Sequence, residues 1–362
     1  MPLDLKSLLK DAVVMAPMTM GSNLPYRRLC DEMGATITMG EMALARKLKQ
    51  GRKQEQVLLK RSPEERVFGV QLAGREEAEL LWATQLAVEK GADLVDLNCG
   101  CPIDEMTRRG LGSAILRQPR KIERLVRAMV EGAAGVPVTV KIRLGWDEDR
   151  LVHIEAARAA EAGGAQALTV HGRTRQARYR RPASWTAIGE VVEAVGIPVI
   201  GNGDILFPHD IARGVAESGC AGVMIARGAL IKPWIFREAV HGAEDPTAES
   251  RLAIYRRYAD FAKEHWGEDD HGLSRASRFL LWHLDFWSRY VPPHADGSFP
   301  GMQEREENFE PRSALEALLK RHDKEAHQHL ATWLLGDPTR PLLPPPEAVA
   351  AGAPERAIIP EG

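Results

Sequence analysis

The sequence predicts an α/β fold, a (β/α)8 TIM barrel followed by a smaller C-terminal all-helical domain. Two observations carry this prediction. Eight short apolar runs alternate with helical segments up to residue 226, which is the pattern of a closed barrel. From about Thr247 onward only helical patterns remain. A doubly wound sheet would need a glycine-rich fingerprint in its first βα turn, and Gly21 alone does not supply one.

The predicted strands are short apolar runs that end at turn or polar residues. They are residues 13–18, 37–42, 67–72, 94–98, 136–143, 167–173, 197–204 and 221–226. The helices predicted between them are residues 26–33, 76–90, 121–131, 151–162, 185–194 and 210–217. The segment 76–90 has the strongest helical signal, because it is rich in Ala, Leu and Glu.

We divide the chain into a barrel of residues 1–243, a helical domain of residues 247–336 and a tail of residues 337–362. A helical domain of about a hundred residues has a normal size. We expect Trp282 and Trp287 to lie in its core. The tail is rich in Pro and Ala, so we expect it to wrap the surface or to stay disordered. The helices predicted in the helical domain are residues 249–265, 274–290, 313–320 and 325–335.

Composition excludes several classes of protein. The 362 residues are 44% hydrophobic and 27% charged with a net charge of −2, which argues against nucleic-acid binding held by bulk charge alone. A local basic face stays possible, because five arginines fall between Arg173 and Arg181. No apolar run is long enough to span a membrane, and the N-terminus does not resemble a secretory signal. Four cysteines form neither a disulfide framework nor a metal spacing, so we expect a reduced, cytoplasmic protein without a structural metal. We also expect a monomer.

Polar residues and one thiol stand at or just past the ends of the predicted strands. Any one of them has a structural explanation, such as a hydrogen-bonded histidine or a surface lysine. Eight such residues are hard to explain as caps, and the carboxyl ends of barrel strands carry active sites. The sequence therefore predicts a site at this end of the barrel. The eight residues are Gln71, Asn98, Cys101, Lys141, His171, Asn202, Asp204 and Arg227.

The turns after the seventh and eighth strands indicate a phosphate-anchored cofactor. The segments 201–204 and 226–228 are glycine-rich and stand where phosphate-binding barrels present backbone N–H groups. Lys141 and His171 would suit the pyrimidine end of a flavin, which gains negative charge on reduction. FMN therefore fits better than a dinucleotide, although segment 201–204 taken alone could equally be an ordinary turn.

Two thiols close the fourth predicted strand, Cys99 and Cys101. Neither Cys30 nor Cys220 has a nearby thiol or histidine in the sequence to complete a metal site. Cys101, on a loop beside Pro102, is suited to deliver a proton to a substrate carbon as a general acid. A nucleophilic Cys-His hydrolase is a weaker option, because no oxyanion-hole signature accompanies the thiol. We expect Cys99 to be a packing residue.

Several motifs together resemble the FMN-dependent tRNA-dihydrouridine synthases. Later stretches, at residues 225–234, 264–267 and 278–280, are most similar to the eukaryotic third branch, which is associated with a variable-loop uridine. We expect this chain to lack the N-terminal zinc-finger region of that branch. The motifs that carry the resemblance are Ala16-Pro17-Met18, Asp96-Leu97-Asn98-Cys99-Gly100-Cys101-Pro102, Val140-Lys141-Ile142-Arg143, Val170-His171-Gly172-Arg173-Thr174 and Gly201-Asn202-Gly203-Asp204-Ile205.

The resemblance implies an enzyme that uses FMN, with NADPH or NADH as reductant, to reduce a uridine of tRNA. Hydride would pass from the flavin to C6 of uracil, and Cys101 would protonate C5. The uridine would have to leave its stack first. The implied FMN contacts are Pro17, Met18, Thr19, Gln71, Lys141, His171, Asn202, Gly203, Asp204, Ala226 and Arg227. The expected substrate contacts are Asn98, Arg143, Arg173, Tyr179, Arg275 and Arg278, the last two by analogy with basic stripes on RNA binders.

Two alternatives stay open at this point. A flavin-dependent oxidoreductase of a free pyrimidine or a dihydroorotate-like molecule explains the FMN site. It does not explain the helical domain or the arginines at 173–181. A non-catalytic RNA-binding protein on a degenerate barrel is the alternative from another class.

Overall fold

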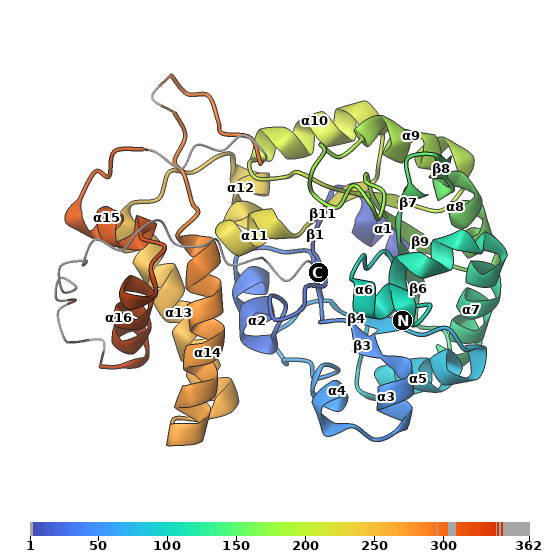
Figure 1. Ribbon diagram of the computed structural model, residues 1–362, viewed down its shortest axis with the longest axis horizontal. Coiled ribbons are helices and arrows are strands. Elements are labelled where there is room, and N and C mark those ends of the chain that lie inside the picture. The colour runs from blue at the N-terminus through green and yellow to red at the C-terminus, as the bar shows by residue number, and fades with distance from the viewer. Residues whose placement is uncertain (1–2, 295, 303–308, 338, 340–341, 343–362) are drawn as a thin grey trace.

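The computed structural model describes residues 3–294, 296–302, 309–337, 339 and 342. Within them, a nine-stranded parallel sheet curls into a closed barrel, shown on the right of Figure 1. Strand β1 pairs with both β11 and β2, and β2 pairs with β4, which closes the ring. The barrel strands are β1 (Ala12–Met15), β2 (Ile37–Met39), β4 (Phe68–Ala73), β5 (Leu94–Cys99), β6 (Val138–Arg143), β9 (Ala167–His171), β10 (Val199–Asn202) and β11 (Gly222–Ile225).

Eight of these strands form the barrel itself, so the predicted fold class is confirmed. The ninth, β3 (Ala43–Leu44), is a two-residue addition beside β4. The strands are buried along almost their whole length, as parallel strands covered by helices must be. The helices that surround the barrel are α2 (Leu24–Glu32), α5 (Glu77–Glu89), α7 (Pro119–Gly132), α8 (His153–Ala162), α9 (Trp185–Ala194) and α10 (Pro208–Ser218).

Several short elements were not predicted. β7 (Gly145–Asp147) and β8 (Arg150–Leu151) form an antiparallel hairpin after β6. The elements that were not predicted are two to seven residues long and carry little periodicity. The others are α1 (Leu5–Leu9), α3 (Ala45–Lys49), α4 (Lys53–Val57), α6 (Asp104–Arg108), the 3-10 helix η1 (Gly112–Arg117), α11 (Arg227–Ile231) and α12 (Ile235–His241).

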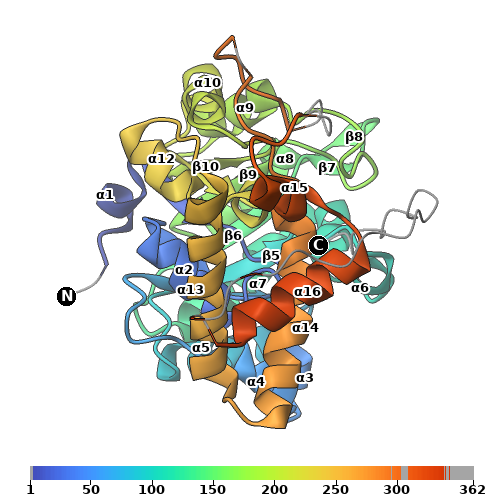
Figure 2. The same cartoon turned by 90° about the vertical axis from the view of Figure 1, so that its left-hand side faces the viewer.

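The C-terminal part is helical, as predicted, and lies on one side of the barrel (Figures 1 and 2). Its aromatic core includes Tyr255 and Trp287, which stack with ring centroids 4.1 Å apart. The predicted boundary at residue 336 stays a prediction, because most of the tail lies outside the described residues. The helices are α13 (Ala248–Trp266), α14 (Asp270–Trp287), α15 (Ala314–Lys320) and α16 (Lys324–Leu335).

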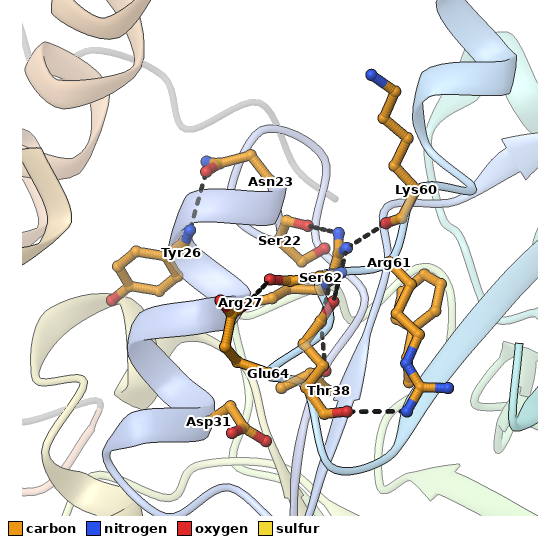
Figure 3. A network of polar contacts seen from close by, with 12 residues as sticks. Ser22, Asn23, Tyr26, Arg27, Asp31, Thr38, Lys60, Arg61, Ser62 and Glu64 are labelled. Atoms are coloured by element: carbon orange, nitrogen blue, oxygen red, sulfur yellow. Dashed lines mark hydrogen bonds and ion pairs between the residues drawn. The ribbon is translucent and has the colours of Figure 1, made fainter. Parts of the chain in front are cut away.

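Helix α2 joins the barrel to these C-terminal helices. Asn23 caps α2 and approaches His283 of α14, with Asn23 Nδ2 3.1 Å from His283 Nε2. On the barrel side, the buried Arg27 pairs with Glu65 at 2.7 Å. Figure 3 shows Arg27 also reaching the main-chain carbonyl groups of Ser22 and Lys60, which accept at 3.1 and 2.6 Å. These contacts hold the loop that follows β1, and that loop carries three of the predicted cofactor contacts.

No described helix combines the length and the apolar character needed to cross a membrane.

Candidate active site

A cavity opens at the carboxyl end of the barrel strands, where the sequence predicted a site. Its empty volume is about 1100 Å³, including space open to solvent. The exposed Arg275 and Arg278 of α14 do not line it. Every predicted barrel residue does: Pro17, Met18, Thr19, Gln71, Asn98, Cys101, Lys141, Arg143, His171, Arg173, Tyr179, Asn202, Gly203, Asp204, Ala226 and Arg227.

The Cys101 thiol lies in the wall of this cavity and is only 7% exposed. Its backbone N–H donates to Asn98 Oδ1 at 2.9 Å, and its carbonyl oxygen accepts from the Ser113 hydroxyl at 2.9 Å. Burial raises the pKa of the Cys101 thiol. The sulfur therefore keeps its proton at neutral pH, which suits a proton donor rather than a thiolate nucleophile. Cys99 is fully buried in the core, as expected of a packing residue.

Lys141 and Asn202 form a hydrogen-bonded pair in the cavity wall, in which Asn202 is buried and Lys141 is partly buried. Lys141 Nζ donates to Asn202 Oδ1 at 3.0 Å, and Asn202 Nδ2 donates to the Met224 carbonyl oxygen at 2.7 Å. Burial, helped by the positive charge of Arg143, lowers the pKa of Lys141 to about 7. This ammonium group can thus lose or regain its proton near neutral pH.

His171 is held as a neutral imidazole. Its Nε2 lies 3.2 Å from Nη1 of Arg173. A guanidinium group can only donate, so Nε2 is the acceptor and Nδ1 carries the proton. Burial and the surrounding cations, including Lys141, lower the pKa of His171 well below its ordinary value. Histidine is therefore a hydrogen-bonding group here and not a cation.

Two arginines share one carboxylate at the side of the cavity formed by β10 and β11. Asp204 accepts from Arg173 at 2.5 Å and from Arg227 at 3.1 Å. The ring of Tyr179 lies under the Arg227 guanidinium, 3.9 Å from centroid to Cζ. Two guanidinium groups and one carboxylate leave one net positive charge, which favours an anionic ligand such as a phosphate.

Arg143 connects two loops at the cavity rim. Its Nε donates to the Gly100 carbonyl oxygen at 2.8 Å, and its Nη1 donates to the Thr174 carbonyl oxygen at 3.1 Å. The side chain is 2% exposed. Arg143 therefore stabilises the main chain beside Cys101 in addition to lining the cavity.

The prediction that Trp282 lies in the core is wrong. Trp282 of α14 is half-buried and lines the cavity, together with Phe286 and Met302. The helical pattern of residues 274–290 shows that Trp282 lies near an apolar face, but not that this face covers a barrel mouth. Trp287, by contrast, is 1% exposed, and its prediction as a core residue is confirmed.

Comparisons with known proteins identify the family of this chain. Residues 14–286 match the dihydrouridine synthase (Dus) family. A tRNA-dihydrouridine(47) synthase (NAD(P)(+)) of Coprinopsis cinerea is 39% identical over 343 residues, which cover 90% of this chain and 51% of that protein. A tRNA-dihydrouridine(47) synthase (NAD(P)(+))-like protein of Homo sapiens is 39% identical over 335 residues, 90% of this chain and 50% of that protein. The chain spans about half the length of these relatives.

One solved structure shows the same fold at low identity. The 6-hydroxypseudooxynicotine amine oxidase of Pseudomonas geniculata N1 aligns with a TM-score of 0.50 at 12% identity, over 69% of this chain and 50% of that chain. A parallel barrel with polar groups at the carboxyl ends of its strands is typical of TIM-barrel enzymes. The family match makes this assignment specific: the chain belongs to the dihydrouridine synthase family.

Proposed function

We propose that this chain is a tRNA-dihydrouridine synthase, which reduces the C5–C6 double bond of a uridine in tRNA. The observation that carries the proposal is the Cys101 thiol, kept protonated by burial in the wall of a cation-lined cavity. The family of the chain and the names of its relatives support the substrate class. Those names also give position 47, which we propose as the target.

The cavity residues fit FMN as the cofactor. The net positive cluster of Arg173, Arg227 and Asp204 suits its phosphate, and Lys141 suits the pyrimidine end of its ring. When bound there, FMN would supply the hydride for C6 of uracil, with NADPH or NADH as the source of its electrons. Gln71 and Asn202 add amide groups that can hydrogen-bond the cofactor. Pro17, Met18, Thr19, His171, Gly203 and Ala226 complete the proposed contacts.

Cys101 transfers the proton in this scheme. Its Sγ–H donates to C5 of the uracil, and a positioned general acid contributes about 100-fold or more to such a step. Asn98 and Tyr179 bind the base, and Arg143 and Arg173, which also line the cavity, complete the proposed substrate contacts there. Moving the uridine out of its stack costs a few kcal/mol. The exposed Arg275 and Arg278 offset part of this cost by binding tRNA phosphates outside the cavity.

NADPH-driven turnover on bulk tRNA, free uridine and orotate tests the proposal. We expect reduction of the tRNA only. Turnover confined to the small molecules would show instead an oxidoreductase of free pyrimidines. A purified protein that is colourless and takes up no FMN would show that the barrel does not catalyse a flavin reaction.

A further inference from the structure

A buried carboxylate lies directly below the cavity. Asp96 of β5 is 2% exposed and stands in register with Gln71 of β4 and Thr139 of β6. It accepts a hydrogen bond from Gln71 Nε2 at 2.8 Å on one oxygen and from the Thr139 hydroxyl at 2.7 Å on the other. Neither Asp96 nor Thr139 lines the cavity above, and the proposed chemistry does not use them.

The hydrogen bonds continue from Asp96 to the Cys101 loop in a fixed direction. An ionised carboxylate only accepts, so the NH2 group of Gln71 must face Asp96. Gln71 Oε1 then accepts from Asn98 Nδ2 at 2.7 Å. This leaves Asn98 Oδ1 to accept from the backbone N–H groups of Gly100 at 3.2 Å and Cys101 at 2.9 Å. The carboxylate at one end and the two backbone N–H groups at the other thus fix the same direction for both amides.

We propose that Asp96 is a positioning residue for the reduction: it fixes the amide orientation of Gln71, and Gln71 in turn holds the Asn98 side chain that binds the main chain of Cys101. The inference rests on the proposed function for its catalytic consequence. The hydrogen bonds that link Asp96 to Cys101 through Gln71 and Asn98 do not depend on that function. Asp96, Gln71, Asn98 and Cys101 are here called the amide relay.

The amide relay also sets the polarity of the cavity wall. Each amide nitrogen uses one of its two N–H groups within the relay, so Gln71 and Asn98 each keep a second N–H. Both residues line the cavity. Gln71 can offer its second N–H to the cofactor, and Asn98, which we propose binds the base, can offer its second N–H to a carbonyl oxygen of uracil. The exocyclic amino group of a cytosine would face the Asn98 donor with another donor and is disfavoured.

The surroundings of Asp96 keep it ionised at neutral pH. Burial raises its pKa to about 6, while the hydrogen bonds from Thr139 and Gln71 and the charge of Lys141 act in the opposite direction. The carboxylate is thus an acceptor under the conditions of an ordinary assay.

Alkylation of Cys101 by iodoacetamide, resolved by peptide mass spectrometry, tests the amide relay without tRNA or turnover. Asp96→Asn removes the fixed acceptor, because the new amide can donate to Gln71 while its oxygen accepts from Thr139. Gln71 is then no longer held in the orientation that accepts from Asn98. We expect the alkylation rate of Cys101 to rise about tenfold, since a hydrogen bond to its main chain is lost. Adding Gln71→Glu places a carboxylate at position 71, which accepts from the new amide at position 96 and from Asn98. The double variant should return the rate toward that of the wild type.

Cys99 and Asp210 supply the controls. Cys99 is fully buried at the end of β5, the strand that carries Asp96, so a rise in its alkylation would report opening of the barrel. Asp210→Asn changes an equally buried carboxylate, which accepts from the N–H groups of Leu206 and Phe207. We expect Asp210→Asn to leave the alkylation of both cysteines unchanged, and Asp96→Asn to leave the alkylation of Cys99 unchanged. A parallel rise at Cys99 in Asp96→Asn, or no rescue in the double variant, would show a structural role and overturn the inference.

Turnover gives the second measurement. We expect Asp96→Asn to lower kcat about tenfold and to leave KM for tRNA unchanged, because the amide relay acts on the proton donor and not on tRNA capture. If Asp96→Asn does not fold, Gln71→Met breaks the relay one step nearer to Cys101 and should also raise its alkylation. Unchanged alkylation in a folded relay variant overturns the inference even if the wild type makes dihydrouridine. Absence of dihydrouridine with the expected alkylation would refute only the proposed function.

Discussion

At the residue scale, the account depends on one protonated thiol. Cys101→Ala should keep the fold and the bound flavin but lose about 100-fold or more of kcat, because the general acid is removed. Dihydrouridine formation in single turnover measures this loss. Cys99→Ala is the matched control, since that thiol is buried in the core away from the cavity. Equal activity of Cys101→Ala and wild type would contradict the role.

The pH dependence of the same thiol follows from its burial. Because burial raises the pKa of Cys101, loss of kcat through its ionisation should begin only above about pH 8.5, the ordinary value for a thiol. A kcat profile from pH 6 to about 10 measures this limb. A thiol that ionised below the ordinary value would lower kcat already near neutral pH and would contradict the assignment.

At the element scale, the loop from Cys101 to Ser113 depends on a glycine. Gly112 has φ +60°, and a Cβ there would lie 2.6 Å from the Cys101 carbonyl oxygen. Gly112→Ala should therefore displace Cys101 and lower kcat several-fold. Gly110→Ala is a close control, because Gly110 has φ +74° but its nearest neighbour would be 3.6 Å away. Because both positions have a left-handed backbone, each substitution costs about 1–2 kcal/mol of stability. Equal kcat values for Gly112→Ala and Gly110→Ala would contradict the steric argument.

Helix α14 carries exposed arginines and also reaches the cavity. Arg275 and Arg278 are exposed there, and Trp282 on the same helix lines the cavity. Changing both arginines to Glu should weaken tRNA binding several-fold and reduce the slope of log Kd against log salt by about 1 for each lost phosphate contact. Binding titrations at several salt concentrations measure this. Arg158→Glu on α8, an exposed arginine of the barrel wall, should have little effect, and an equal loss there would contradict a specific role for α14.

At the scale of the whole molecule, the junction between α2 and α14 should be sensitive to acid. His283 is completely buried, and burial lowers its pKa well below the ordinary value. As pH falls below about 6.5, the unfolded chain takes up this proton before the folded chain does, so stability falls by up to about 1.4 kcal/mol per pH unit. His283→Phe keeps a ring against Tyr26 and should show a shallower fall between pH 7 and about 5. Urea unfolding measures both slopes, and equal slopes would contradict the argument.

The sequence reveals much of this molecule because parallel strands bring their carboxyl ends together. Residues as distant as Gln71 and Arg227 therefore meet in one cavity. Trp282 could not be placed in this way, since its position depends on how α14 docks across the barrel. The role of Asp96 was not predicted for a different reason. The residue opens one of the motifs, but a polar residue within a buried strand carries no periodic signal, and its role depends on cross-strand partners. The β7–β8 hairpin was too short to predict.

The central claim is that this chain reduces a uridine of tRNA. Mapping dihydrouridine in tRNA incubated with NADPH, with and without the protein, tests it most directly. We expect one new dihydrouridine, at position 47, with wild-type protein and a strongly reduced amount with Cys101→Ala. No dihydrouridine in any tRNA, with flavin bound and reduced by NADPH, would contradict the account.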